Sequence, residues 1–279
     1  MNKRRRRPIR PSHIVIHALL IGGSIVMLLP FVWMISTSLK GPDEILTDSI
    51  DIIPNDIRWE NYSEAWTAQP FGRYFLNTIF IAVVTVIIEL LFASMAAYAF
   101  AFFQFPFKSA IFYIFLGTMM IPQQALLVPD YVILSKLRWI DSYFALIVPF
   151  CTSVYAIFLL RQFFMTLPRD LYDAAVVDGC SKLRFYFSVL LPLSIGPMVT
   201  IGIFSFLGSW NSFIWPLVVT NSEHLRVLQV GLAYFLQESG TEWGLLMAAS
   251  TFTTVPLVIG YFVAQRRFTQ TIAITGMKG

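Results

Sequence analysis

The sequence predicts an all-α polytopic membrane protein with six transmembrane helices. Three observations predict it: an apolar composition, a series of long apolar runs, and an uneven distribution of Lys and Arg. Hydrophobic residues make up 57% of the 279 positions and charged residues 13%, whereas soluble domains carry about 25% charged residues. A single aqueous core cannot bury so much apolar surface, so contact with the lipid bilayer is expected.

Six apolar runs each approach the roughly 20 residues that a helix needs to cross about 30 Å of hydrocarbon. A helix is favoured because an open strand would leave backbone N–H and C=O groups unpaired in lipid. The expected helices are His13–Ser36, Tyr74–Ala99, Ala110–Ile133, Tyr143–Phe164, Ile195–Val219 and Leu245–Ala264. Prolines interrupt or bound several of these helices and permit kinks: Pro122, Pro129, Pro149, Pro197, Pro216 and Pro256.

The Lys and Arg residues predict the orientation, because positively charged loops stay on the cytoplasmic side. Residues 1–12 are strongly basic and are expected to be a cytoplasmic N-terminus. Six crossings then place the C-terminus inside as well. With this orientation, 14 of the 20 Lys and Arg residues face the cytoplasm.

The first apolar run, residues 13–36, is expected to be a retained helix. A basic start before an apolar run also resembles a signal peptide. A cleaved peptide has a shorter apolar core of about 7 to 15 residues, whereas this run reaches about 24 residues before Leu39-Lys40-Gly41. A retained transmembrane helix is therefore the better interpretation.

The acidic segment 37–72 is too polar to span and is expected to be an external loop. A short helix is predicted near Trp59–Ala68, with Asn61 as its cap and aromatic side chains at the membrane interface. A second external stretch, Asn221–Trp243, could contact a partner, although an ordinary solvated loop is the better interpretation of both stretches. Residues 73–265 then form a five-helix core, and residues 266–279 a cytoplasmic tail.

No catalytic or metal-binding constellation is expected. Cys151 and Cys180 are distant in sequence, and neither has a neighbouring cysteine or a histidine cluster, so both are interpreted as small space-filling residues. The chain also has no Gly-x-x-x-x-Gly-Lys-Ser/Thr phosphate loop. It is therefore not expected to be an enzyme, to bind a cofactor or to hydrolyse ATP itself.

The long inward connection, residues 165–192, carries the functional information. Pro168 suits a first helical turn, Asp170 and Asp173 favour the positive end of a helix dipole, and Gly179 suits a left-handed stop. A helix of about ten residues is predicted. Ser181 can cap a second helix that runs toward Pro192. Two helices that meet at Gly179 would form a compact knob with the small Ala174 and Ala175 on its surface.

At this point the residues resemble the membrane-spanning subunits of ABC importers, specifically the smaller permease subunit of the maltose-type carbohydrate-uptake systems. The family signature is Glu-Ala-Ala, three residues, Gly, nine residues, then an aliphatic residue, one more, Leu and Pro. Here Asp173-Ala174-Ala175 is followed at those spacings by Gly179, Val189 and Leu191-Pro192. Asp173 replaces the usual Glu, which keeps the charge but shortens its reach. Cys180 stands where Ala is common.

The resemblance implies a type I ABC importer fold in the bacterial cytoplasmic (inner) membrane. The implied partners are a second permease subunit in a heterodimer, two cytoplasmic ATPase subunits that use ATP and Mg²⁺, an extracellular or periplasmic solute-binding protein, and the lipid bilayer, with no nucleic acid. The implied cargo is a sugar, an oligosaccharide, or a related polyol or glycerophosphate. The resemblance assigns ATPase coupling to Asp173, Ala174, Ala175, Asp178, Gly179, Cys180, Leu191 and Pro192.

A substrate pathway through the spans is predicted less directly. An ionisable group at mid-membrane costs on the order of 2.5 to 3.5 kcal/mol, so Glu89 is expected to face protein or water. It could line the pathway, or it could be protonated and hydrogen-bonded to a neighbouring helix. Amide and indole groups suit sugar binding. The pathway candidates are Glu89, Gln123, Gln124, Trp210, Asn211 and Trp215.

A secondary active transporter is the main alternative function. It would also explain six helices, but it predicts several ionisable residues at mid-membrane and often a repeat between the halves. Glu89 is nearly alone in the predicted spans. A membrane-embedded enzyme predicts convergent His, Asp or Ser groups at one depth, and these are not apparent in the sequence. A channel or scaffold leaves the signature loop without a purpose.

Overall fold

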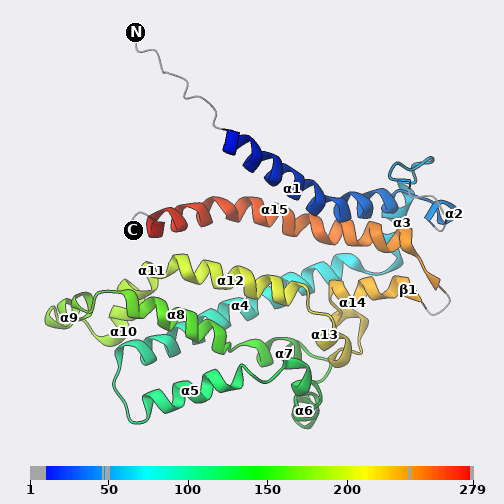
Figure 1. Cartoon of the computed structure of the whole chain (residues 1–279). Coiled ribbons are helices and arrows are strands. Elements are labelled where there is room, and N and C mark those ends of the chain that lie inside the picture. The colour runs from blue at the N-terminus through cyan, green and yellow to red at the C-terminus, as the bar shows by residue number, and fades with distance from the viewer. Residues whose placement is uncertain (1–10, 46, 48–50, 238–239, 277–279) are drawn as a thin grey trace. The chain divides into compact units, whose positions relative to one another are not determined.

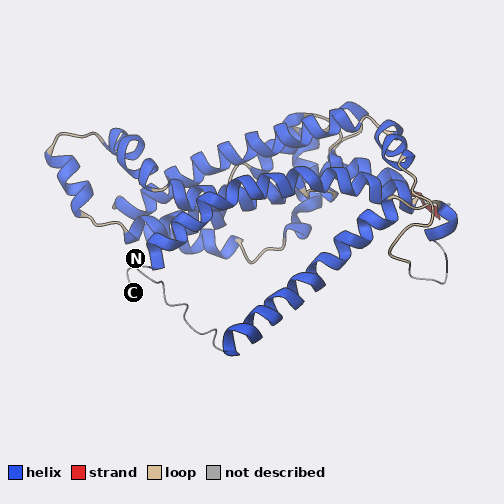
Figure 2. Ribbon diagram, turned by 90° about the horizontal axis from the view of Figure 1, so that it is seen from above, coloured by secondary structure: helices blue, strands red, loops and turns tan. Residues whose placement is uncertain are grey.

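The computed structural model describes residues 11–45, 47, 51–237 and 240–276. Helices make up most of this part of the chain, and the strands form one short pair (Figure 2). The chain divides into two compact units. Unit 1 comprises residues 1–69 and 234–256, and unit 2 comprises residues 70–233 and 257–279.

Unit 1 contains helix α1 (Pro11–Ser38), the short helices α2 (Pro42–Ile45) and α3 (Glu60–Ala68), and a hairpin of β1 (Leu236–Gln237) and β2 (Gly240–Thr241). The first part of α15 (Trp243–Gly276) completes it. Apolar side chains are exposed along most of α1, from Val15 to Ile35. Such a helix, apolar on all sides, suits a lipid environment.

Within unit 1, Asn61 connects α3 to the end of α1, and it is not the predicted cap of α3. It lies inside α3, and its amide donates hydrogen bonds of 2.9 Å to the backbone oxygens of Ser38 and Lys40. A Cβ atom on Gly244 would lie 3.2 Å from the Asn61 amide nitrogen and 3.3 Å from the Lys40 oxygen. A larger residue where α15 begins would therefore have to displace one of these groups by a few tenths of an ångström. The prediction of Asn61 as a cap was wrong because α3 begins before it, at Glu60.

Unit 2 is built around α4 (Phe71–Phe102), against which α8 (Val154–Thr166) and α12 (Ile195–Trp210) pack (Figure 1). The other elements of unit 2 are shorter: α5 (Lys108–Thr118), α6 (Gln123–Lys136), α7 (Tyr143–Ile147), η1 (Val148–Phe150), α9 (Asp170–Val177), α10 (Lys182–Phe185), η2 (Tyr186–Leu190), α11 (Leu191–Leu193), α13 (Ile214–Val219), η3 (Glu223–Leu225) and α14 (Leu228–Leu232). The turn η4 (Ala233–Phe235) leads into unit 1. Helices α9 and α10 lie at one end of unit 2, and α13 and α14 at the other (Figure 1).

Among the described residues, four helical segments are long and apolar enough to cross a membrane. They are Val15–Ser38, Phe71–Phe102, Tyr143–Thr166 and Trp243–Phe262. Two bent helix pairs bring the number to six if each pair counts as one span: Lys108–Thr118 with Gln123–Lys136, and Lys182–Leu193 with Ile195–Trp210. These segments fall on the six apolar runs of the sequence.

The third predicted helix, Ala110–Ile133, is not continuous. Helices α5 and α6 meet at an angle of 98°. Pro122 has no N–H to donate and disfavours helical geometry in the residue before it. The chain instead forms tight turns, with Met120 N–H bonded to Gly117 O and Ile121 N–H to Thr118 O, both at 3.1 Å.

The fifth predicted helix, Ile195–Val219, ends early. Helix α12 stops at Trp210, and α13 resumes at Ile214. The Asn211 side chain donates a 2.9 Å hydrogen bond to Leu207 O and so caps the end of α12. At its other end α12 is bent by 75° from the preceding helical segment. The last helix is longer than predicted. The expected helix ended at Ala264, whereas α15 extends to Gly276.

Two apolar clusters form the core of unit 2. The larger lies near α9 and α10 and includes Ala97, Tyr98, Leu160 and Phe185. The smaller lies toward α13 and includes Ile81, Leu146, Trp215 and Val219. Helix α4 contributes to both clusters, so it connects the two ends of the unit.

Candidate functional site

The connection between α8 and α12 forms a knob of two short helices, α9 and α10. Helix α9 carries Asp170 and Asp173 in its first turn, where the helix dipole favours negative charge. It is eight residues long and begins after Pro168, so it is slightly shorter than the sequence predicted.

The turn between these helices is a Schellman motif. Gly179 has a φ of 74°, in the left-handed region. Its N–H bonds to Val176 O at 3.0 Å, and the N–H of Cys180 bonds to Ala175 O at 2.8 Å, which satisfies two carbonyls at the helix end. Ser181 then accepts a 3.3 Å hydrogen bond from Arg184 N–H and caps α10, as the sequence predicted.

The outer face of the knob is apolar and rimmed by charge. Val176 and Val177 are 53% and 87% exposed, and Leu183 is 65% exposed. Ala174 is exposed with them. The charged rim consists of Asp173, Asp178, Lys182 and Arg184. An exposed apolar patch with a polar rim is typical of a protein interaction site.

The inner face of the knob packs on α4 through aromatic rings. The Tyr172 ring lies 5.0 Å from that of Phe185 and 5.4 Å from that of Phe102. Tyr98 stacks on Tyr186 at 5.6 Å, and its hydroxyl donates a 3.2 Å hydrogen bond to Lys182 O. The five aromatic residues are called the aromatic anchor below: Tyr98, Phe102, Tyr172, Phe185 and Tyr186. They attach the knob to the end of α4.

A buried hydrogen bond reinforces the anchor. The hydroxyls of Ser94 and Tyr186 lie 2.7 Å apart, and both residues are at most 1% exposed. Ser94 also donates to Leu91 O at 3.0 Å. The single proton of Ser94 is thereby used, so the hydroxyl of Tyr186 is the donor to Ser94.

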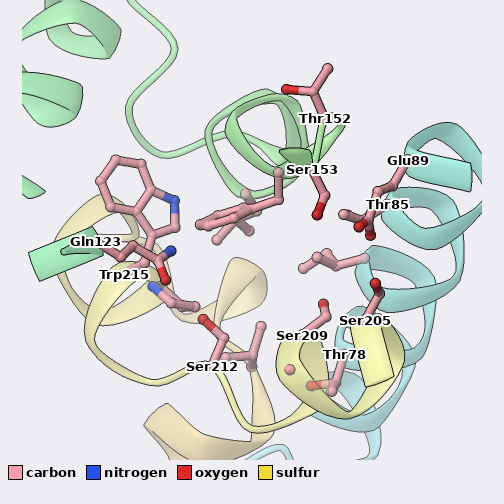
Figure 3. A pocket seen from close by; sticks show the side chains of 16 residues that line it. Thr78, Thr85, Glu89, Gln123, Thr152, Ser153, Ser205, Ser209, Ser212 and Trp215 are labelled. Carbon is pink, nitrogen blue, oxygen red and sulfur yellow. The ribbon is translucent and has the colours of Figure 1, made fainter. Parts of the chain in front are cut away.

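A pocket of about 430 Å³ lies beside the middle of α4 (Figure 3). Helices α4 and α12 form two of its walls, and residues 150–153 and α13 form others. Seven hydroxyl side chains line it: Thr78, Thr85, Thr152, Ser153, Ser205, Ser209 and Ser212. The Glu89 carboxyl shares this lining with the hydroxyls of Ser153 and Ser205.

The two α4 hydroxyls in the pocket differ in their hydrogen bonding within the fold. Thr78 accepts a 3.0 Å hydrogen bond from Leu228 N–H. Thr85 is 4% exposed, and its hydroxyl has no partner among the described residues. On another wall, the Trp215 indole donates to Ala145 O at 2.9 Å, which fixes the ring against the pocket.

Beyond the pocket, Asp141 connects the loop before α7 to the loop after α13. Its carboxylate accepts hydrogen bonds of 2.9 Å from the backbone N–H groups of Asn221 and Ser222, and a further one from the Ser222 hydroxyl. These hydrogen bonds lower the pKa of Asp141 from its ordinary value, because they favour the charged carboxylate. The side-chain amide of Asn77 also donates 2.8 Å hydrogen bonds to the backbone oxygens of His224 and Arg226.

Comparison with known proteins agrees with this architecture. Residues 89–274 match the model of a family described as binding-protein-dependent transport system inner membrane component. The chain belongs to this family. It is a multi-pass permease of the bacterial inner membrane, and the apolar helices agree with that location.

Curated relatives resemble the permease over nearly its whole length. The diacetylchitobiose uptake system permease protein NgcG of Streptomyces coelicolor is 34% identical over 92% of this chain and 86% of its own. The arabinooligosaccharides transport system permease protein AraQ of Halalkalibacterium halodurans is 34% identical over 91% and 92%. The sn-glycerol-3-phosphate transport system permease protein UgpE of Yersinia pestis is 31% identical over 93% and 95%.

A solved structure shows the same fold. It is a bacterial ABC transporter involved in the import of the acidic polysaccharide alginate, and it matches with a TM-score of 0.81 at 23% identity. The match covers 94% of the permease and all of that chain. The type I ABC importer fold expected from the sequence is thereby confirmed.

The structure divides the predicted coupling residues of the permease between the two faces of the knob. Exposed positions are Asp173, Ala174, Asp178, Gly179 and Pro192. Ala175, Cys180 and Leu191 are half-buried and pack against the larger apolar cluster. The two alanines therefore do not share one surface, although they are adjacent in sequence.

Three of the six predicted pathway residues line the pocket: Glu89, Gln123 and Trp215. The other three, Gln124, Trp210 and Asn211, are not among its lining residues. Trp210 is 2% exposed and lies between the rings of Phe75 and Phe206, at 6.0 and 5.7 Å. Asn211 uses its side chain to cap α12. Proximity in sequence to Trp215 did not place either residue in the pocket.

The hydroxyl residues of the pocket were missed in the sequence, although a signal was present. Thr78, Thr85 and Glu89 are spaced by seven and four residues, which places them on one face of a helix. Ser205 and Ser209 follow the same rule on α12, with a spacing of four, and Ser212 follows just after the end of that helix. A polar stripe at helical spacing inside an apolar span predicts a polar cavity.

Proposed function

We propose that this permease is a membrane subunit of an ABC importer that carries a carbohydrate across the cytoplasmic membrane. A separate ATPase subunit drives it through the knob. The observation that carries the proposal is the double attachment of α4: one end of this helix holds the knob through the aromatic anchor, and its middle forms a wall of the pocket.

The knob provides the contact with the ATPase. Its exposed apolar patch, with Ala174 and Val177 at the surface, can enter a cleft in a partner, and the charged rim can orient it. Asp173 pairs with the ATPase surface in this proposal, and Gly179 provides the turn. ATP and Mg²⁺ are used by two copies of that partner.

Transport follows from the rigid connection between knob and pocket. When the ATPase subunits close, α9 moves with them, and the rings of Tyr172 and Phe185 transmit the displacement to Tyr98 and hence to α4. Helix α4 carries Thr78, Thr85 and Glu89, so its movement changes the shape of the pocket. A second, different permease subunit completes the route, and an external binding protein delivers the solute.

The names of the relatives support a carbohydrate cargo. NgcG and AraQ are named for diacetylchitobiose and arabinooligosaccharides, and UgpE for sn-glycerol-3-phosphate. The hydroxyl lining and Trp215 suit a sugar, because hydroxyls donate and accept hydrogen bonds and an aromatic ring packs on apolar sugar faces. A secondary transporter receives less support, since Glu89 is the one ionisable group among the described residues of the pocket.

The knob can be tested by Ala174→Arg, which places a long charged side chain on the exposed patch. Co-purification of the ATPase and ATP-driven uptake should both be lost, while membrane insertion is retained. Ser63→Arg is the matched control, because Ser63 is equally exposed but lies on α3 in unit 1. An unchanged ATPase complex with Ala174→Arg would overturn the proposed coupling.

A further inference from the structure

We propose that the pocket beside α4 binds neutral polyhydroxylated solutes, and that the carboxylate of Glu89 excludes anionic ones. The inference deepens the proposed function by naming the charge class of the cargo, and it rests on that function. Glu89 is thus a specificity-determining residue. The argument uses the charges, the hydroxyls and the unmet hydrogen bond of the pocket.

The pocket contains one ionisable side chain. Sixteen described residues line it, and among them Glu89 is the sole acid or base (Figure 3). No lysine, arginine or histidine among these lining residues can neutralise a phosphate or a uronate. When Glu89 is ionised, its repulsion of a second negative charge at about 6 Å and an effective dielectric constant of about 20 weakens binding roughly a hundredfold. Residual water and salt reduce this toward tenfold.

The remaining polar groups suit a neutral sugar. The seven hydroxyl side chains of the pocket each donate and accept hydrogen bonds, as sugar hydroxyls do. Phe150 and Trp215 add apolar ring surface. The Glu89 carboxyl lies at the pocket wall with the hydroxyls of Ser153 and Ser205, where it can accept a hydrogen bond from a solute hydroxyl.

Thr85 is a lining residue of the pocket whose buried hydroxyl the described fold leaves unused. Its hydroxyl is buried, lines the pocket and has no partner in the described part of the chain, although buried polar groups are nearly always hydrogen-bonded. Thr85 lies one helical turn from Glu89 on the same face of α4. A solute hydroxyl placed between the two residues would satisfy both.

The inference separates this permease from two of the proteins that it resembles. UgpE is named for an anionic solute, and the solved structure belongs to a transporter of an acidic polysaccharide. The overall fold is shared with the alginate importer at a TM-score of 0.81. Similarity of fold therefore does not set the charge of the cargo, whereas the pocket residues do.

The experiment compares matched neutral and anionic solutes. The full complex, with its partner permease and ATPase subunits, is placed in lipid nanodiscs, and binding is measured by Trp fluorescence and calorimetry. The neutral probes are galactobiose, arabinobiose and diacetylchitobiose, and the anionic probes are digalacturonate and sn-glycerol-3-phosphate. At least one neutral probe should bind ten times more tightly than either anion.

Glu89→Gln should then raise the affinity for the anionic probes ten- to a hundredfold and lower the ratio of neutral to anionic affinity at least tenfold. The matched control is Glu60→Gln, which removes a negative charge from the exposed start of α3 and should leave the ratio unchanged. Tighter binding of an anion by the unmodified complex, an unchanged ratio in Glu89→Gln, or no binding of either class would overturn the inference.

Thr85→Val provides a test that does not depend on Glu89. Because the Thr85 hydroxyl has no partner in the described fold, its removal should not lower the melting temperature, while it weakens the neutral probe at least fivefold. Thr78→Val should lower the melting temperature, because it removes the acceptor of Leu228 N–H. Undiminished binding by Thr85→Val would count against the site.

Failure of the proposed function would look different. In that case the unmodified complex would show no ATP-driven uptake of any probe in proteoliposomes that contain the binding protein. If ATP-driven uptake is present but favours anions, the proposed importer stands and the charge inference fails.

Discussion

The hydrogen bond between Ser94 and Tyr186 gives a quantitative test of the aromatic anchor. Ser94→Ala leaves the Tyr186 hydroxyl without its acceptor in a site where both residues are at most 1% exposed. Tyr186→Phe removes the donor, but Ser94 keeps its 3.0 Å bond to Leu91 O. The two single variants should therefore not cost the same.

The expected magnitudes follow from this asymmetry. A stranded buried hydroxyl costs about 1 to 3 kcal/mol, so Ser94→Ala should destabilise by that amount. Tyr186→Phe loses an ordinary hydrogen bond and should cost about 0.5 to 1.5 kcal/mol. The double variant should cost less than the sum by about 0.5 kcal/mol or more, because no hydroxyl is then stranded.

The assay is reversible unfolding of the purified complex, followed by circular dichroism in a denaturing detergent. Ser63→Ala is the control, since the Ser63 hydroxyl is exposed and bonds within its own helix, and should change stability by less than about 0.5 kcal/mol. Additive costs in the double variant, or a greater cost for Tyr186→Phe than for Ser94→Ala, would refute the proposed geometry. The same variants should also lower transport per ATP hydrolysed, since they loosen the knob.

Three further predictions concern turns and close contacts. Gly231→Ala should destabilise by about 1 to 3 kcal/mol, because its Cβ would lie 2.6 Å from the ring of the buried Tyr74. Gly208→Ala, in helix α12 with nothing within 4 Å of its Cβ, should keep or raise the melting temperature. Gly179→Val should abolish ATPase association, and Gly179→Asn should retain it in a pull-down, because Asn tolerates the left-handed conformation. Because the pKa of Asp141 is lowered in the folded protein, its carboxylate stabilises the loops that it connects at pH values above the ordinary pKa of 3.8. This stabilisation is lost as the pH falls through the folded pKa. Asp141→Asn should therefore flatten the dependence of loop hydrogen exchange on pH in that range, and an unchanged profile would contradict the prediction.

The sequence was sufficient for the spans and for the turn of the knob. Apolar runs locate helices because lipid leaves the backbone few alternatives. Gly179 and Ser181 act locally, so their roles were predictable from the chain alone. The 98° bend at Pro122 was less certain, since a proline inside a membrane helix can kink it or end it.

The pocket was harder to predict because it depends on which helices pack together. Thr85 and Ser205 are far apart in sequence, and their proximity follows from the packing of α12 on α4. Trp210 and Asn211 were predicted in the pathway from residue type. Neither lines this pocket, and the Asn211 side chain caps the end of α12. Composition identifies sugar-binding groups, but tertiary packing decides which of them meet.

Helix α4 has no proline and, after Gly72, no glycine, so it is expected to behave as a stiff rod. Thr78 lies 20 residues from Tyr98 along it, or roughly 30 Å at 1.5 Å per residue. If the knob end acts as a pivot, a tilt of about 10° would move the Thr78 end by about 5 Å, the width of a sugar ring. A lever of this length would allow a small rotation at the ATPase to open or close the far end of the pocket while Glu89, nearer the pivot, moves less than half as far.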